Sequence, residues 1–269
     1  MRRELYKYLL GCISFAFYCF ALYAQPAKTM LPDSGIKVMT YNIHHANPPS
    51  KDSLIDMDAI VKVIRAQSPD LVALQEVDQL TERSGKIDQA KYIAEKLGMH
   101  YFYAKAMDYD GGAYGQAILS KFPIKATAVR RLPSTAEPRS EPRILGEAII
   151  QLPNGKSLRF ATVHLDAQKN DTNRILQAKA IISLLANDET PMIIAGDFNA
   201  VRSSEAMHIL DAGFEHSCTE CDFTIPVLSP NKTIDFILLD KRKSWSVLSH
   251  KTIKETYASD HFPVVTVLK

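Results

Sequence analysis

The chain is built from short apolar runs, several of which end abruptly in residues that can bind metals or move protons. The clearest run is MIIAGDFNA, in which four apolar residues lead into Gly196, Asp197, Phe198 and Asn199. A short apolar run bounded by turn residues is typical of a buried strand. Because alternate residues of a strand share one side, we expect Asp197 and Asn199 to lie together at the rim of a sheet.

Other segments repeat this combination of an apolar strand and a polar end. They are KVMTYN with Asn42, LVALQE with Glu76, FATVHLD with His164 and Asp166, TIDFILL with Asp235, and FPVVTVL preceded by Ser259, Asp260 and His261. One such cluster is equally well explained as a turn, because Gly, Asp and Asn are favoured where strands end. The repetition across the whole chain favours an active site at which strand ends converge.

Helical spacing of apolar residues predicts fewer helices than strands. The expected helices are 56–67, which stops at Ser68-Pro69, then 90–97, 172–186 and a short one at 207–210. Strands are expected at 36–41 and 71–78, as a pair within 99–124, and as a hairpin within 147–166 that turns at Asn154-Gly155. Successive strands without intervening helices predict an α/β fold of mixed sheets with helices outside, and argue against an alternating parallel barrel.

The length of 269 residues and the hydrophobic content of 46% permit a sizeable core. No low-complexity run, internal repeat or linker rich in Pro, Gly and Ser divides the chain. We therefore expect a single catalytic domain over residues 25–269.

The N-terminus has the pattern of a secretory signal. The basic stretch MRRELYK precedes an uncharged apolar run that ends at Ala24, a small residue suited to cleavage. The bulky Leu22 and the length of the run keep an uncleaved membrane anchor open as an alternative. We predict a signal peptide at residues 1–24 and an exported protein, periplasmic or secreted.

Charge and cysteine content change after that cleavage. Loss of residues 1–24 removes three of the 32 Lys and Arg and one of the 30 Asp and Glu, which leaves 29 of each. A neutral protein gives no support for broad electrostatic binding to nucleic acid. The two remaining cysteines, Cys218 and Cys221, lie in an irregular segment, and in an exported protein they most simply form a small disulfide loop.

Asn42 and Glu76 are candidate ligands from their positions alone. A carboxylate that directly follows a buried strand is costly unless it is paired or bound to a cation, so Glu76 is a candidate for a hard metal. The amide of Asn42 can orient a metal-bound carboxylate or a phosphate oxygen, or it can simply form a turn. His44 and His45 follow in the chain, but adjacent loop histidines are more often solvated than liganding.

Three arginines lie in polar loops. Arg83 belongs to TERSGKIDQ, and Arg139 and Arg143 belong to a proline-rich stretch. A guanidinium can bind a phosphate group through two parallel hydrogen bonds, which makes all three candidates for substrate binding. Solvated loop residues are the alternative for each.

Seven motifs, taken in order, make the chain resemble the DNase I-like endonuclease/exonuclease/phosphatase superfamily. They are MTYNIH, LQEVD, YGQAILSKFPI, TVHLD, GDFNA, TIDFILL and SDHFPV, and they span nearly all of the chain after residue 24. The resemblance implies a four-layer α/β/β/α sandwich of two mixed β-sheets with helices outside. It also implies a site at one end, between the sheets.

The resemblance implies a magnesium site, with Mn²⁺ as a substitute. Glu76 resembles the principal ligand, and Asn42 and Asp260 resemble its supporting residues. Carboxylate and amide oxygens suit magnesium, which takes only one or two protein carboxylates. The sequence contains no set of thiolates and no compact histidine cluster that would favour zinc.

The resemblance also assigns the reacting groups. Asp197 resembles the residue that activates the attacking water, or alternatively a metal ligand, and Asn199 the group that steadies the pentacoordinate phosphorus. His164 and His261 resemble the histidines at the scissile phosphate, and Asp235 the carboxylate that orients His261. Phosphoester hydrolysis needs such positioned groups rather than a covalent nucleophile, and no G-x-S-x-G elbow occurs in the chain.

The function predicted from the sequence is metal-dependent hydrolysis of a phosphoester, as a phosphodiesterase acting on a small or lipid-derived substrate. The shared motifs recognise the phosphate and leave a secreted nuclease of DNA or RNA as the alternative. A non-catalytic binding protein is a remote third, because Glu76, Asp197 and His261 are all present. No protein partner is evident, and we expect a monomer.

Overall fold

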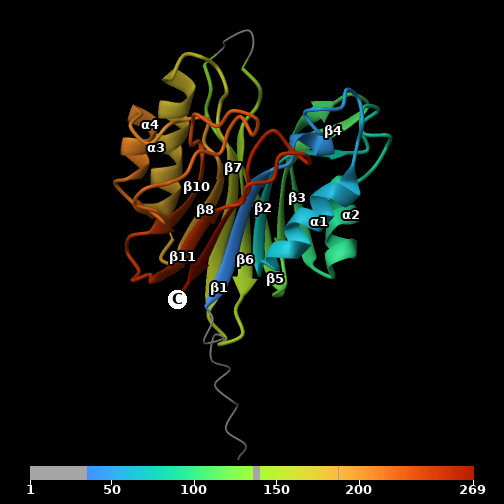
Figure 1. Cartoon of the computed structure of the whole chain (residues 1–269). Helices are drawn as coiled ribbons and strands as arrows, with labels where there is room; N and C mark the ends of the chain where they lie inside the picture. Colours follow the sequence, from blue (N-terminus) through green and yellow to red (C-terminus); the bar gives the residue numbers. More distant parts are fainter. Residues whose placement is uncertain (1–34, 136–139, 187) are drawn as a thin grey trace, which may run out of the picture.

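The computed structural model describes residues 35–135, 140–186 and 188–269. In that part of the chain, the strands form two six-stranded mixed sheets packed face to face, with helices on the outer faces (Figure 1). This arrangement confirms the predicted four-layer sandwich. The predicted signal segment 1–24 and the candidate Arg139 lie outside the described residues.

The first sheet holds the N-terminal and C-terminal strands side by side. Its strands, in spatial order, are β11 (Val247–Thr252), β12 (Val264–Leu268), β1 (Ile36–Asn42), β2 (Leu71–Gln79), β4 (Gly112–Ser120) and β3 (His100–Tyr109). β1 and β2 run parallel, and the other neighbours run antiparallel.

The second sheet repeats this plan with one parallel pair, β7 and β8, near its centre. Its strands, in spatial order, are β5 (Ile124–Arg131), β6 (Ile144–Gln151), β7 (Ser157–His164), β8 (Met192–Asp197), β10 (Asp235–Asp240) and β9 (Phe214–His216). Because parallel strands end at the same edge, β1 and β2 deliver their last residues together, as do β7 and β8.

Each sheet carries its own pair of α-helices. They are α1 (Met57–Gln67) and α2 (Gln89–Leu97) on the first sheet, and α3 (Thr172–Ala186) and α4 (Glu205–Leu210) on the second; a short 3-10 turn, η1 (His44–Ala46), follows β1. Asp56 caps α1, since its side chain accepts a hydrogen bond from the Ala59 amide at 3.0 Å. The predicted helix therefore begins one residue late, at Met57.

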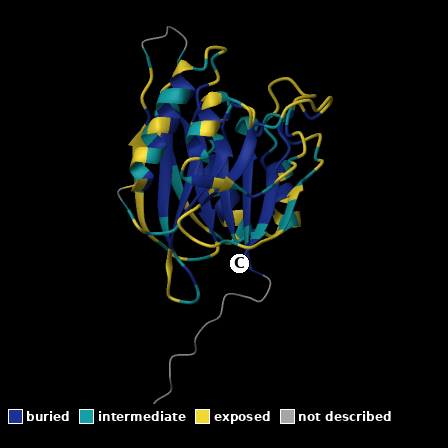
Figure 2. Cartoon of the chain, turned by 90° about the vertical axis from the view of Figure 1, so that its left-hand side faces the viewer, coloured by how far each residue is buried: buried dark blue, intermediate teal, exposed yellow. Residues whose placement is uncertain are grey.

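The core consists of three apolar layers, one between the sheets and one under each helix pair. Leu71 of β2, Phe160 of β7 and Ile193 of β8 belong to the layer between the sheets and are fully buried. Figure 2 shows the buried strands in the middle and the partly exposed helices outside. Two tightly packed sheets give the strand ends a rigid frame.

Three edge strands, β5, β9 and β11, were not predicted from the sequence. β5 has the exposure pattern of a sheet margin, with no fully buried residue, so its sequence IKATAVRR has no apolar run to detect. β9 is only three residues long, and β11 is likewise exposed or half-buried throughout. Pairing with an already formed neighbour, and not local sequence, creates these strands.

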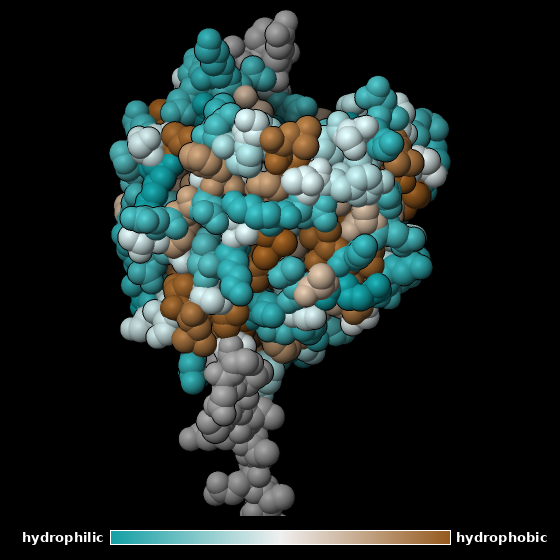
Figure 3. Space-filling view, in the orientation of Figure 1, coloured by the Kyte–Doolittle hydropathy of each residue, from teal (hydrophilic) through white to brown (hydrophobic). Residues whose placement is uncertain are grey.

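Surface features add little to the functional picture. On the face seen in Figure 3, hydrophilic residues surround several separate hydrophobic patches. No helix within the described ranges is long and apolar enough to cross a membrane. Cys218 and Cys221 form a disulfide with Cα atoms 5.5 Å apart, which confirms the predicted pairing.

Candidate functional site

The polar strand ends of both sheets meet at one end of the sandwich. Asn42 closes β1 beside Gln75 of β2, and His164 closes β7 directly opposite Asp197 of β8. Asp235, the first residue of β10, is paired with Asp197 from the other side. The strand register therefore assembles residues from distant parts of the chain, as the repeated sequence pattern predicts.

Asp197 occupies the centre of this assembly. Its side chain is 2% exposed, and its two oxygens accept hydrogen bonds from Asn42 Nδ2 at 3.1 Å and the Asn199 amide at 2.8 Å. Burial and the nearby Asp235 charge raise the pKa of Asp197 to about 7. A buried carboxylate with such a pKa can accept a proton near neutral pH.

Two histidines flank Asp197 in different protonation environments. The Nε2 atoms of His164 and His261 lie 3.6 and 3.7 Å from Asp197 Oδ2. Burial opposes charging of His261, but the carboxylate of Asp235, 2.9 Å from His261 Nδ1, raises the pKa of His261 to about 10. Burial and the Arg143 charge hold the pKa of His164 well below its usual range. One imidazole is thus charged and the other neutral.

Glu76 lies on the first-sheet side, with 23% of its side chain exposed. Its Oε1 accepts a hydrogen bond from Asn42 Nδ2 at 3.1 Å, so one amide bridges Glu76 and Asp197. Burial opposes ionisation, but the imidazoles of His45 and His164 and the Asn42 amide lower the pKa of Glu76 overall. The carboxylate therefore remains charged although it is largely enclosed.

Asp260 lies at the same end but apart from the cavity. It is half-buried, and Ser259 Oγ, which donates to Asn42 O at 2.7 Å, lies 3.5 Å from Asp260 Oδ1. Asp260 is absent from the residues that line the cavity described below. Its predicted support of Glu76 remains a prediction.

A cavity of about 360 Å³ opens over these groups. Its lining residues are His44, His45, Glu76, Arg83, Met107, Tyr109, Tyr114, Glu141, Arg143, His164, Ala167, Asp197, Asn199 and His261. The predicted residues Asn42 and Asp235 lie behind this surface and hold Asp197 and His261 in place.

Arg83 reaches the cavity in a fixed orientation. Its Nε and Nη2 donate to Asp78 Oδ2 and Oδ1 at 2.7 and 2.8 Å, and its guanidinium lies 4.5 Å from the ring centroid of Tyr109. Asp78 is fully buried and also accepts hydrogen bonds from Thr81 and Ser84. This bidentate pair leaves part of Arg83 facing the cavity as a rigid donor.

Arg143 is buried beside His164 and Tyr114. Its Nη2 lies 3.1 Å from Glu141 Oε2, and its Nε is buried without a hydrogen-bond partner in the described structure. Burial of Tyr114 and the charge of Glu76 raise the pKa of Tyr114 well above its usual value, so its phenol stays protonated. Arg143 and Tyr114 therefore present donors that suit an anionic group.

Several cavity residues were missed in the sequence. The sequence predicts that His44 and His45 are solvated, but both are half-buried and line the cavity, as do Met107, Tyr109 and Tyr114. Their position two and three residues after Asn42 is the one local signal that could have placed the histidines in the site. The structure brings His44 and His45 beside Glu76, and the three side chains form a group that could hold a metal ion.

The residues present fit a divalent cation. Glu76 is charged and faces the cavity, and its Oε2 accepts no hydrogen bond within the described part of the chain. His44, His45 and Glu76 bring one ligand atom each within 4.8 Å of one another, and so do Asp197, Asp235 and His261. An enclosed carboxylate with a bare oxygen is a typical cation ligand.

Known proteins share both sequence and fold with this chain. It is 26% identical over 248 residues to the uncharacterized protein YbhP of Escherichia coli, which covers 85% of this chain and 94% of that protein. An endonuclease/exonuclease/phosphatase from Beutenbergia cavernae superposes with a TM-score of 0.74 and 21% identity, over 88% of this chain and 72% of the other. The mannosyl-6-phosphatase of Bacteroides thetaiotaomicron gives a TM-score of 0.72 and 20% identity, over 87% and 100%.

The family assignment rests on the sequence match that spans both sheets. Residues 39–261 match the Endonuclease/Exonuclease/phosphatase family, from within β1 to the histidine before β12. Members of this family are hydrolases that act on phosphoesters, typically with a divalent metal. On the strength of that match and the shared fold, the chain belongs to the Endonuclease/Exonuclease/phosphatase family.

Proposed function

We propose that the protein is a metal-dependent phosphodiesterase or phosphatase that acts on a small or lipid-derived phosphoester. The observation that carries the proposal is the convergence of Glu76, Asp197, His164 and His261 on one compact cavity. Phosphoryl transfer requires positioning and charge neutralisation more than covalent chemistry, and this set supplies both. Magnesium is the ion expected from the oxygen ligands, with Mn²⁺ as a substitute.

In this proposal Asp197 accepts a proton from the attacking water. Asn42 and the Asn199 amide each hold one of its oxygens, so the carboxylate has a single orientation. The side chain of Asn199 donates to Leu165 O at 3.0 Å, which keeps it at the cavity edge, where it would contact the phosphoryl group of a bound substrate. General base catalysis of this kind contributes about 10²–10⁴ in rate.

The two histidines act on the phosphate oxygens. His261 carries a proton because Asp235 stabilises the imidazolium, so it can donate to the phosphoryl group or leaving oxygen. Neutral His164 donates one hydrogen bond without adding charge, and Arg143 supplies a buried guanidinium. Preorganised donors aimed at developing negative charge lower the barrier without reorganisation.

A divalent ion held by Glu76, with Asn42 and Asp260 in support, would neutralise the negative charge on the phosphoryl oxygens. The surroundings of Glu76 favour binding of such an ion, because they keep the carboxylate ionised and leave one of its oxygens free to face the cavity. Asn42 links the ion-binding and proton-transferring groups through one amide.

The shape of the cavity supports a small substrate. Its volume of about 360 Å³ lies near the lower end of the roughly 300–1,000 Å³ usual for small-molecule sites. Arg83, fixed by Asp78, stands with Tyr109 in the wall and limits the space beside the reacting groups. The mannosyl-6-phosphatase among the structural neighbours supports the same size of substrate.

A substrate panel tests this proposal. Supercoiled plasmid, single-stranded DNA, RNA, phosphoinositides, sphingomyelin and sugar phosphates are each incubated with Mg²⁺, with Mg²⁺ plus excess EDTA, and with the Asp197→Asn variant. We expect a small or lipid phosphoester to be hydrolysed fastest, and both EDTA and the variant to abolish that turnover. Plasmid nicking without turnover of small or lipid esters would support the nuclease alternative, and full activity in EDTA would refute metal dependence.

We further propose that the protein is exported after cleavage at Ala24 and acts as a monomer without a protein partner. The N-terminal pattern, a basic stretch followed by an uncharged apolar run that ends at Ala24, supports the export. Intact mass after expression in the native host, together with light scattering, tests it. A mass that retains residues 1–24 would contradict cleavage at Ala24, and a dimer mass would contradict the monomeric state.

A further inference from the structure

The turn after β1 has an unusual backbone. His44, His45 and Ala46 have φ angles of 45°, 42° and 61°, so three consecutive residues other than glycine adopt the left-handed region. Residues with a Cβ rarely adopt this backbone conformation, and only surrounding contacts can maintain it over three consecutive residues. Glu76, which faces this turn, also has a positive φ, of 55°.

Buried hydrogen bonds hold this turn in place. Gln89, which is fully buried at the start of α2, donates to His45 O at 2.7 Å and accepts from the Asp78 amide at 2.9 Å. The Asp56 amide donates to Ala46 O at 2.8 Å. The turn is therefore attached to β2 and to both helices of the first sheet, and two adjacent imidazoles face the same cavity.

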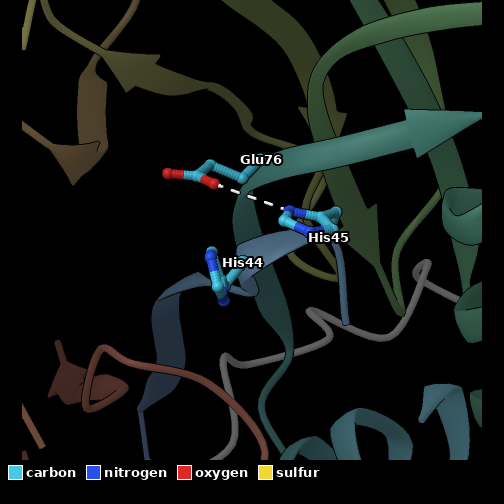
Figure 4. Close-up of side chains that lie close together, drawn as sticks. All are labelled: His44, His45 and Glu76. Atoms are coloured by element: carbon cyan, nitrogen blue, oxygen red, sulfur yellow. Dashed lines mark ion pairs between the residues drawn. The ribbon is translucent and has the colours of Figure 1, made fainter. Parts of the chain in front are cut away.

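The histidines present bare nitrogen atoms. His44 Nδ1 lies 2.9 Å from Asn47 O, and because a carbonyl only accepts, the neutral ring carries its proton on Nδ1 and has a lone pair on Nε2. His45 Nδ1 is buried without a hydrogen-bond partner in the described residues, 4.0 Å from Glu76 Oε2. Figure 4 shows both rings beside the Glu76 carboxylate.

The spacing of the three side chains suits one ion. Their ligand atoms all lie within 4.8 Å of one another. Neighbouring ligands around a tetrahedral ion with bonds of about 2.1 Å stand about 3.4 Å apart, so side-chain rotations that bring the three atoms closer together close the site. The hydrogen bond from Asn42 occupies Glu76 Oε1 and leaves Oε2 for the ion.

We propose that His44, His45 and Glu76 together bind a divalent transition-metal ion, Zn²⁺ or Mn²⁺, in preference to Mg²⁺. Imidazole nitrogen is a good ligand for transition metals, whereas Mg²⁺ selects oxygen. Two imidazoles beside one carboxylate therefore shift the ion preference of the site away from the magnesium expected from its oxygen ligands. The role of the ion in hydrolysis rests on the proposed function, but its binding is measurable without any substrate.

The first test measures metal affinity. Equilibrium dialysis with elemental analysis compares Zn²⁺, Mn²⁺ and Mg²⁺ binding to the wild type and to the His44→Asn/His45→Asn double variant. Asparagine tolerates the left-handed region, so the turn should be kept while the imidazoles are lost. The matched control is His100→Asn, an exposed histidine of β3 outside the cavity.

We expect one Zn²⁺ or Mn²⁺ per wild-type chain with at least about tenfold tighter binding than Mg²⁺. The double variant should lose about tenfold or more in affinity for Zn²⁺ and Mn²⁺, with Mg²⁺ binding unchanged within twofold and the His100→Asn control like the wild type. Equal affinities of the wild type for all three ions, or a double variant that keeps its Zn²⁺ affinity, would overturn the proposal.

A second measurement needs no variant. Pulsed electron paramagnetic resonance of Mn²⁺ bound to the wild type should show coupling to imidazole nitrogen, and an all-oxygen signal would refute the site even if the double variant does not fold. Nitrogen coupling without hydrolysis of any phosphoester would refute the proposed function and leave the metal site standing. Hydrolysis of a phosphoester together with an all-oxygen signal would refute the metal site of His44, His45 and Glu76 and leave the proposed function standing.

Discussion

The two walls of the cavity differ in how their polar groups are satisfied. On the first-sheet wall, 23% of the Glu76 side chain and 16% of that of His45 are exposed, and each has a polar atom without a hydrogen bond in the described structure. On the second-sheet wall, β8 and β10 supply Asp197 and Asp235, and the segment before β12 adds His261. These side chains are between 1% and 6% exposed and are joined by hydrogen bonds and close contacts, although Asp235 Oδ1 is buried without a hydrogen-bond partner in the described structure. Asn42 bridges the two walls.

This difference separates two tasks. Free lone pairs in a partly enclosed site suit an added cation. His45 Nδ1 is 4.0 Å from Glu76 Oε2, too far for a hydrogen bond. Groups that are buried and paired shift one another's pKa values and suit proton transfer. The cluster of strand ends therefore contains two chemically distinct halves, and each half can be disrupted separately.

The largest effect should come from the second wall. Asp197→Asn removes the proposed base while keeping shape, and we expect kcat to fall by roughly two orders of magnitude or more. His261→Ala should act similarly. Metal affinity, measured by titration without substrate, should change little, and the melting temperature should stay near that of the wild type.

A fall in metal affinity equal to the fall in kcat would place Asp197 on the metal-binding wall. A collapse of the melting temperature in both variants would instead assign Asp197 and His261 a structural role. Either result would break the division between the walls.

Disrupting the first wall should have a different signature. Glu76→Gln removes the charged ligand, and we expect metal affinity to fall about tenfold to 100-fold. Because the second wall is intact, kcat at saturating metal should recover most of its value. The measurement is activity as a function of metal concentration; a loss of kcat that no metal concentration restores would show that Glu76 also takes part in proton transfer.

The pH profile sharpens the roles within the second wall. The pKa of Asp197 is raised to about 7, so the base is available only above that pH, and activity should rise up to about tenfold per pH unit below it. The pKa of His261 is raised to about 10, so its proton is lost and activity falls above that pH. A kcat/KM profile that stays flat from pH 5 to 7 would contradict this assignment of the base.

The smallest effect should come from outside both walls. The Cys218→Ala/Cys221→Ala variant opens a short disulfide loop, which should lower the free energy of unfolding by about 2 kcal/mol or less. Arg202 Nη1 donates to the carbonyls of Cys218 and Thr219 at 3.2 and 2.6 Å and should hold the loop. Denaturant unfolding measures the change, while an altered kcat would connect this loop to the cavity.

The sequence by itself determined the strands of the sandwich interior and the chemistry at their ends. Apolar runs made β1, β2, β7, β8 and β10 recognisable, because strands buried on both faces need apolar residues at nearly every position. A polar residue at the end of such a run can only be at the rim, so Asp197 and Glu76 could be proposed as site residues from local sequence.

Only the tertiary structure decided which polar residues face the cavity and in what state. The local sequence predicts that His44 and His45 are solvated. In the structure, Gln89, 44 residues away from His45, fixes the turn that directs both histidines to Glu76. Arg83 is fixed by Asp78, and the pKa values of Asp197 and His261 depend on Asp235 from another strand. These properties come from burial and from contacts between distant segments, which exist only once the two sheets have packed together.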